Sequence, residues 1–205
     1  MDSAERSAKQ AELEQLRDRA AELEREISAG PEHWEATEFY TGYYATAGFV
    51  LGMFGAVTSL IFNVVGSALV EQHPLRLIQI YLTFPLGERA LQLSGRLTLT
   101  IGCCLYIATG MLLGAPFHVL LTWAADKATF GYRLVAASIL ATSMWLVHFY
   151  LILAWLQPLL FGGSWIVERI PWWVGLVTHL VYGWTMALVF PLGRYVPYRR
   201  QTEQI

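Results

Sequence analysis

Two histidines in apolar segments are the residues of this sequence whose type and spacing could carry chemistry. His148 lies about ten residues before Pro158, and His179 lies eight residues after Pro171. At a rise of ~1.5 Å per residue, two antiparallel helices joined between these prolines would hold both imidazoles roughly 12 to 15 Å from the same loop. We therefore expect His148 and His179 to share a depth on neighbouring helices.

Such a pair of imidazoles is compatible with three roles. Axial ligation of a haem b iron needs two neutral imidazoles that approach opposite faces of one macrocycle. A quinone or another small apolar ligand could be held by the same two side chains. A histidine between packed helices also commonly hydrogen-bonds to a hydroxyl or carbonyl of a neighbouring helix. The candidate hydroxyls for this third role are Thr142, Ser143, Thr178 and Thr185.

Other patterns that would indicate catalysis are absent from the sequence. No Asp, Glu, Lys or Arg lies centrally in the long apolar segments, and such side chains are what proton relays and ion pathways require. There is also no nucleotide-binding loop, HExxH zinc motif or nucleophile elbow. The adjacent Cys103 and Cys104 are interpreted as small buried apolar side chains, and His118 as a structural residue. We expect a protein that is not an enzyme.

The composition indicates a membrane protein. Of 205 residues, 55% are apolar and only 15% are charged, and the mean hydropathy is +0.42, which is unlike a soluble domain. The charges are concentrated at the start of the chain, since residues 2–38 hold eleven acidic and five basic residues while residues 39–70 hold none. A net charge of -2 without a basic stripe excludes nucleic acid as a partner.

The fold class predicted is an all-α integral membrane protein with four transmembrane helices. A helix needs about 20 mostly apolar residues to cross a bilayer. Four segments meet this requirement, at about 40–70, 97–123, 132–157 and 172–192. Prolines shape their ends: Pro116 is expected to kink the second, Pro158 to end the third, and Pro171 to begin the fourth.

Residues 72–95 are predicted to lie at the membrane surface. Their apolar run, 75–84, is about ten residues long and is interrupted by Arg76 and Gln79, so it is too short to cross. The alternation of apolar and polar residues favours an amphipathic interfacial helix. The alternative is a shallow re-entrant stretch that turns at Pro85 and Gly87.

Small residues recur at helical spacing in two of the four segments. They are Gly48, Gly52 and Gly55 in the first segment and Gly175 and Gly183 in the fourth. Such residues let helix backbones approach closely where lipid provides no hydrophobic drive for association. We predict that these glycines pack against other helices and that Asn63 hydrogen-bonds across a helix interface.

Residues 1–30 are predicted to form a charged helix. Leu13, Leu16, Ala20, Leu23 and Ile27 alternate by three and four, as in the seam of a coiled coil. Two heptads are short for a stable dimer, so this helix pairs weakly with itself, docks on a partner, or is simply solvated. Gly and Pro at positions 30 and 31 end it, and residues 31–39 form a linker.

The distribution of Lys and Arg predicts the orientation. With four spans, both termini lie on one side, which collects ten basic residues against four on the other. The ten are Arg6, Lys9, Arg17, Arg19, Arg25, Lys127, Arg133, Arg194, Arg199 and Arg200, and the four are Arg76, Arg89, Arg96 and Arg169. We therefore expect a multi-pass protein of the cell membrane with both termini, including the basic tail 194–205, in the cytoplasm.

Three functions follow as hypotheses. The leading one is a non-catalytic subunit or scaffold that packs against other integral membrane proteins, or against itself, within the lipid bilayer. The second is an electron-transfer subunit that binds haem b or a quinone through His148 and His179. The third is a small oligomeric channel or carrier, which requires a continuous polar lining.

Overall fold

The computed structural model describes residues 3–29 and 39–196, which fall into two separate units. Helix α1 (Ser3–Ala29) belongs to the first unit and agrees with the helix predicted over residues 1–30. Leu13, Leu16 and Leu23 are all exposed on α1. Their pairing in a coiled coil stays a prediction. The second unit, residues 40–196, contains the remaining elements.

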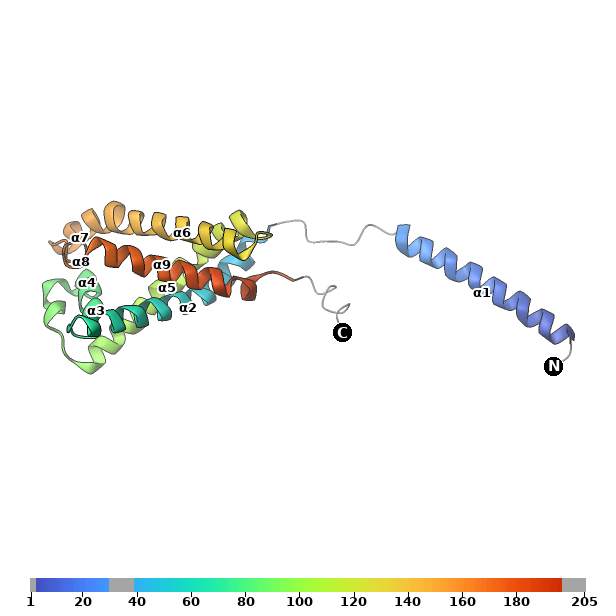
Figure 1. The fold of residues 1–205 in the computed structure, drawn as a ribbon, viewed down its shortest axis with the longest axis horizontal. Helices are drawn as coiled ribbons and strands as arrows, with labels where there is room; N and C mark the ends of the chain where they lie inside the picture. Colours follow the sequence, from blue (N-terminus) through green and yellow to red (C-terminus); the bar gives the residue numbers. More distant parts are fainter. Residues whose placement is uncertain (1–2, 30–38, 197–205) are drawn as a thin grey trace. The chain divides into compact units, whose positions relative to one another are not determined.

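Four long helices lie side by side in the second unit (Figure 1). They are α2 (Thr41–Leu69), α5 (Arg96–Ala125), a third helix made of α6 (Phe130–Leu146), the π-helix η2 (Val147–Leu153) and α7 (Ala154–Phe161), and α9 (Trp172–Val189) with its 3-10 extension η3 (Phe190–Gly193). Each of the four is long and apolar enough to cross a membrane. The predicted number and position of the apolar helices are therefore confirmed.

The third helix departs from the prediction at its end. Pro158 was expected to stop it at Gln157, but Pro158 lies inside α7, and the helix continues to Phe161. Gly162 ends it instead, in the left-handed region at φ 81°, and its N–H donates to the carbonyl of Pro158 at 2.9 Å. A glycine that adopts this conformation satisfies the last carbonyls of a helix, whereas a proline near the end removes only one hydrogen bond. Pro116 lies inside α5, and the kink expected there stays a prediction.

Short helices close one end of the bundle. Residues 76–92 divide into α3 (Arg76–Tyr81), α4 (Thr83–Leu86) and the 3-10 helix η1 (Gly87–Gln92), and α8 (Trp165–Arg169) lies beside them. The chain reverses at Gly87, where φ is 64°, a value that favours glycine. The predicted single helix over 72–95 is thus broken into three pieces. Ile78, Leu82 and Thr83 are fully or almost fully buried, so the segment packs against the bundle.

Glycines set the closest contact in the bundle, between α2 and α5. A Cβ atom placed on Gly52 would lie 2.5 Å from the carbonyl oxygen of Gly110 and 3.0 Å from the Cα of Gly114. Gly48 would meet Gly114 and the side chain of His118 in the same way. The two backbones therefore touch directly, an arrangement that only glycine permits.

The other glycines singled out from the sequence contact aromatic or small side chains. Gly55 lies against the ring of Tyr182, so α2 also packs on α9. In the same helix as Tyr182, Gly175 lies against Phe149 and Gly183 against Ala141. These contacts join α9 to both α6 and the π-helix.

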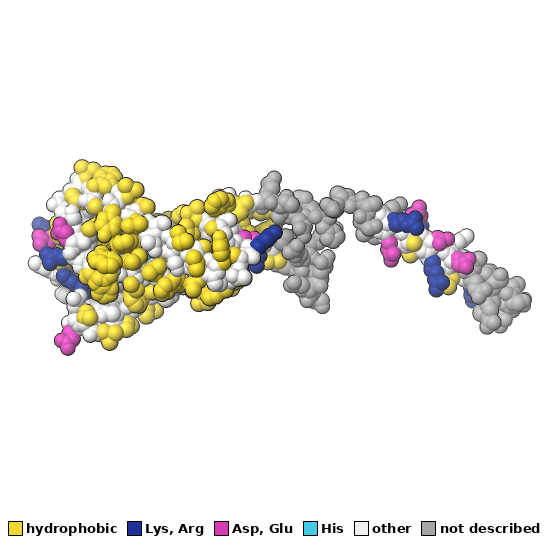
Figure 2. All heavy atoms as spheres, turned by 45° about the horizontal axis from the view of Figure 1, so that its top comes forward, with side chains coloured by type: hydrophobic (Ala, Val, Ile, Leu, Met, Phe, Trp, Pro, Cys, Tyr) yellow, Lys and Arg dark blue, Asp and Glu magenta, His cyan; other side chains and the backbone are white. Residues whose placement is uncertain are grey.

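The surface of the second unit is largely apolar. Leu112, Ile139 and Leu188 are each more than 60% exposed on three different helices. Figure 2 shows apolar side chains over much of the visible face of this unit and charged side chains gathered toward its ends. Exposed apolar area of this extent is unusual for a water-soluble monomer.

We predict that Gly52→Ala destabilises the bundle by about 1–3 kcal/mol, because the added methyl group has to push two backbones apart. Thermal unfolding of the detergent-solubilised protein measures this loss. Gly66→Ala is the matched control on the same helix, since a Cβ there meets nothing within 4 Å; it should leave stability unchanged or raise it by up to about 1 kcal/mol. Equal effects of the two substitutions would contradict the backbone contact.

Candidate functional site

An apolar cavity of about 550 Å³ lies within the half of the bundle that carries α3, α4 and α8. Its volume falls in the range of small-molecule sites, about 300–1,000 Å³. Its wall includes Ala56, Ser59, Leu77, Tyr81, Phe84, Pro85, Leu105, Tyr106, Thr109, Gly110, Leu113, Met144, His148, Phe149, Ile152, Leu153, Ile166, Ile170, Gly175, Thr178, His179 and Tyr182. None of these carries a formal charge at neutral pH when the histidines are neutral. Helices far apart in the sequence therefore line one mostly apolar site.

His148 and His179 meet on the wall of this cavity. The Nδ1 of His148 lies 3.3 Å from the Nε2 of His179, within hydrogen-bonding distance. His148 projects from the π-helix η2, and His179 from α9. A π-turn shifts the register of the side chains that follow it, and such turns recur at functional sites. The depth shared by the two residues follows from their spacing to the prolines, but the π-turn has no signal in the sequence.

The hydrogen bonds of the pair fix which nitrogen atoms carry protons when both rings are neutral. The Nδ1 of His179 lies 2.7 Å from the carbonyl oxygen of Gly175, and a carbonyl can only accept, so His179 is protonated at Nδ1. Its Nε2 is then an acceptor and receives the N–H of His148 Nδ1. The Nε2 of His148 consequently carries a lone pair and no proton.

The direct contact of the two rings does not fit bis-histidine ligation of a haem. Two metal–nitrogen bonds of about 2 Å each would place the ligating nitrogens about 4 Å apart with the macrocycle between them. Here the two nitrogens share one proton at 3.3 Å, and the ring centroids are 5.5 Å apart. A small apolar ligand beside the pair requires no such separation.

A hydrogen-bonded pair of hydroxyls forms the wall between α2 and α5. The Ser59 hydroxyl donates to the Ala56 carbonyl at 3.0 Å. Its oxygen is therefore free to accept from the Tyr106 hydroxyl, which lies 3.0 Å away. Both hydroxyl protons are used within the protein.

Two further tyrosines on the wall are bonded in the same manner. The Thr109 hydroxyl donates to the Leu105 carbonyl at 2.9 Å, so Tyr81 donates to Thr109 at 2.6 Å. Tyr182 donates to the Gly110 carbonyl at 2.7 Å. These bonds hold α3 and α9 against α5.

Thr178 connects the cavity wall to a buried amide. Its hydroxyl donates to the Val174 carbonyl at 2.7 Å, and the amide of Asn63 donates to Thr178 at 3.0 Å and to the Ser59 carbonyl at 2.7 Å. The predicted interhelical hydrogen bond of Asn63 is confirmed. It joins α2 to α9 one residue away from His179.

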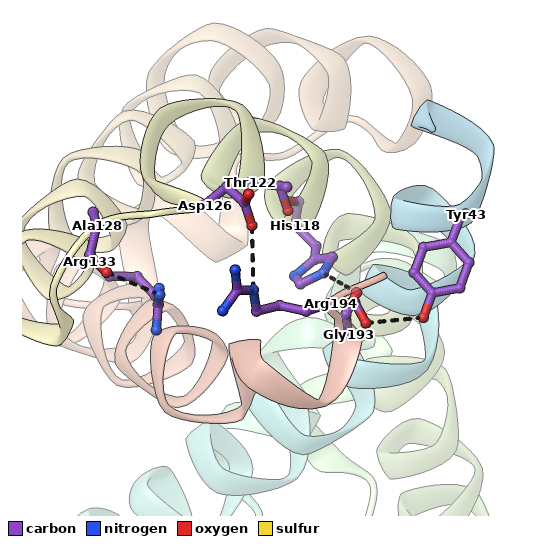
Figure 3. Close-up of polar contacts among 8 residues, drawn as sticks. All are labelled: Tyr43, His118, Thr122, Asp126, Ala128, Arg133, Gly193 and Arg194. Atoms are coloured by element: carbon purple, nitrogen blue, oxygen red, sulfur yellow. Dashed lines mark hydrogen bonds and ion pairs between the residues drawn. The ribbon is translucent and has the colours of Figure 1, made fainter. Parts of the chain in front are cut away.

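A second polar cluster closes the opposite end of the bundle (Figure 3). Arg194 forms an ion pair with Asp126 at 3.4 Å, and its carbonyl accepts a hydrogen bond from Tyr43. His118 is fully buried, with its Nε2 3.5 Å from the carbonyl of Gly193. These contacts tie the end of η3 to α5 and α2, which agrees with the structural role expected for His118.

Arg133 belongs to the same end of the bundle. Its guanidinium lies 4.2 Å above the ring of Phe190 and donates to the carbonyl of Ala128 at 3.2 Å. A cation over an aromatic ring stabilises the contact by roughly 0.5–2 kcal/mol. Arg133 therefore fixes the start of α6 against η3.

Within the part of the chain that the structure describes, no three His, Cys, Asp or Glu side chains gather into a group that could hold a metal ion. Comparison with known protein families, curated proteins and solved structures gives no match. The site is therefore interpreted from its own geometry.

Four of the eight polar side chains that line the cavity were not predicted from the sequence. Tyr81, Tyr106, Thr109 and Tyr182 were not singled out, although they form the wall together with the two histidines. A tyrosine in the middle of a long apolar segment was the available signal, because a hydroxyl there needs a partner. Which partner it finds depends on helix packing and cannot be read locally.

The Asn63–Thr178 contact generates a quantitative prediction. In a cycle of Asn63→Ala, Thr178→Val and the double variant, we expect a coupling of about 0.6–1.7 kcal/mol, the range for hydrogen bonds between apolar helices. Unfolding of the solubilised protein by titration with a denaturing detergent measures it. A control cycle combines Asn63→Ala with Thr185→Val, because the Thr185 hydroxyl donates to the carbonyl of Val181 in its own helix and, among the described residues, not to Asn63. If the coupling energy in the control cycle were as large as in the first cycle, the hydrogen bond between Asn63 and Thr178 would not be its source.

Proposed function

We propose that this chain is a multi-pass membrane protein that binds a small apolar molecule in the cavity between α2, α5, the π-helix and α9. The cavity carries the proposal, because its volume, its apolar wall and its few convergent polar side chains are those of a ligand site. His148 and His179 support it, since ionisable residues within apolar helices mark functional sites by default. Of the roles expected for this pair, binding of a small apolar ligand fits the geometry best.

Placement in a membrane is part of this proposal. Four helices of sufficient length and hydropathy, together with an exposed apolar surface, favour it. The proposed orientation puts both termini in the cytoplasm. Lys127, Arg133 and Arg194 lie at the end of the bundle where α2 begins, whereas Arg76, Arg89, Arg96 and Arg169 belong to the opposite end. These loops alone are nearly balanced, with three basic residues against four. The excess comes from the chain ends, because five basic residues precede α2 in the sequence and Arg199 and Arg200 follow η3, which makes ten against four. This excess follows the positive-inside rule, and residues 76–92 would then lie at the outer membrane surface.

The other functions expected from the sequence have less support. A channel or carrier needs a continuous polar path, but the cavity wall is mostly apolar and its hydroxyls bond to protein groups. A role as subunit or scaffold stays a prediction and is compatible with ligand binding. The exposed leucines of α1 would then contact the partner, and co-purification under mild detergent would identify it.

We predict that filling the cavity removes ligand binding. The probe is a hexadecane that carries a photoreactive diazirine and a terminal alkyne, so it has no polar headgroup. It should label residues 105–113 and 144–153 saturably in the purified full chain, and Leu113→Trp should weaken this labelling by about tenfold or more, a loss of about 1.4 kcal/mol or more. Leu112→Trp is the control, because Leu112 is 65% exposed and lies outside the cavity. Labelling that both variants leave unchanged, or that never saturates, would refute the proposed function.

The orientation predicts which exposed loops are accessible from outside intact cells. In a background with Cys103 and Cys104 replaced by Ala, Glu88→Cys should react with a membrane-impermeant maleimide. Lys127→Cys should react only after permeabilisation, because it lies at the other end of α5. Both positions are exposed in the structure, so burial cannot explain a difference. The reverse pattern would invert the proposed topology, and equal reactivity of both in intact cells would argue against insertion.

A further inference from the structure

The hydrogen bonds of the cavity wall restrict which polar group a bound ligand can carry. The inference about this polar group rests on the proposed function, namely that the cavity binds a small apolar molecule. The wall contains eight polar side chains: Ser59, Tyr81, Tyr106, Thr109, His148, Thr178, His179 and Tyr182. Six of them are hydroxyls, and each hydroxyl proton already has an acceptor inside the protein. A hydroxyl that turned toward a ligand would give up a bond of equal quality.

The two histidines also offer no proton to the cavity. The Nδ1 proton of His179 goes to the carbonyl of Gly175, and that of His148 goes to His179. Of the four ring nitrogens, only Nε2 of His148 has no hydrogen-bond partner among residues 39–196, and it is not one of the fully buried atoms there that lack a partner. An imidazole nitrogen of this kind is a strong acceptor.

We propose that the cavity selects a neutral apolar molecule that bears a hydroxyl, and that His148 Nε2 accepts the hydrogen bond from it. A ligand whose polar group only accepts, such as an ether, an ester or a quinone carbonyl, finds no donor on the wall and loses its hydrogen bond to water. A charged headgroup finds no counter-charge there, because no Asp, Glu, Lys or Arg among the described residues lines the cavity. The fitting chemistry is therefore that of a long-chain alcohol or of a quinol in preference to its quinone.

The positions of the two histidines assign them different tasks. His148 contacts the ligand hydroxyl. His179 is a positioning residue: its bonds to Gly175 and to His148 hold the His148 proton on Nδ1 and so keep Nε2 as an acceptor. In metal sites, a hydrogen bond to one ring nitrogen of a histidine similarly fixes its tautomer, so that the other nitrogen can bind the metal. Here the other nitrogen would bind a ligand hydroxyl instead.

Two matched probes test the selectivity. One is hexadecan-1-ol with a mid-chain diazirine and a terminal alkyne, and the other is its methyl ether, which differs only in lacking the donor. On the purified full chain, the alcohol should half-saturate labelling of the cavity segments at a concentration about five- to tenfold lower than the ether. This ratio corresponds to the gain in affinity from about one hydrogen bond. Equal half-saturation would overturn the headgroup inference while leaving the cavity function intact. If neither these probes nor the hexadecane probe labels the cavity segments saturably, the proposed function itself fails.

Three histidine variants separate the two roles. His148→Phe should raise the half-saturation of the alcohol to that of the ether. His179→Phe should lower the half-saturating concentration of the ether to near that of the alcohol. Without His179, His148 could carry its proton on either nitrogen, so Nε2 could donate to the ether as well as accept from the alcohol. His73→Phe is the control, since His73 is exposed and outside the cavity, and it should keep the full preference. An alcohol preference that survives His148→Phe would overturn the assignment of His148.

A measurement on the unmodified chain keeps the inference testable if a variant fails to fold. In protein labelled with ¹⁵N-histidine, the signals of His148 and His179 should both be those of neutral imidazoles protonated at Nδ1. The alcohol probe should shift the Nε2 signal of His148 and the ether should not. A His148 protonated at Nε2 would overturn the proposal. Competition by decyl-hydroquinone and by unlabelled hexadecanol then distinguishes a phenolic from an aliphatic hydroxyl as the preferred group.

Discussion

The contact between the backbones of α2 and α5 is the constraint on which the rest of the structure depends. Gly48, Gly52, Gly110 and Gly114 let the two backbones touch over about one turn of each helix. Beyond this point the small residues give way to Ser59 and Tyr106, whose side chains need space between the helices. Gly110, Ala56, Ser59 and Tyr106 all line the cavity, so the cavity begins directly beside the glycine contact.

A second constraint acts within that cavity. Inside an apolar bundle, each polar group that lacks a partner costs roughly 1–3 kcal/mol, so the hydroxyls bond to carbonyls of their own or neighbouring helices. These bonds hold Tyr182 against α5 and Asn63 against α9. The same bonds remove almost all hydrogen-bond donors from the cavity surface. Helix packing and the proposed ligand preference would therefore have one physical cause.

The sequence predicts the long helices well because their signal is local. Length and apolar composition place four segments within a few residues of α2, α5, α6–α7 and α9, and the glycine spacing indicates their packing faces. The sequence does not predict a helix end or helix type correctly where two local signals compete, or where a tertiary contact determines the conformation. Pro158 is a valid stop signal, but Gly162 satisfies the helix end better, and the helix continues past the proline. For the π-turn at His148 we find no local signal.

The candidate site shows the same division between local and tertiary information. The spacing of His148 and His179 to their prolines is enough to predict that the residues lie level, but it does not distinguish ligation of an iron between the rings from a direct hydrogen bond. That distinction depends on the distance between two helix axes, which Gly175 and Gly183 set by packing against Phe149 and Ala141. With small residues at both positions, α9 lies close enough to the third helix for the rings to meet at 3.3 Å. The glycines predicted as packing residues thus also determine the chemistry of the histidines, because a wider separation would leave both rings free to bind something between them.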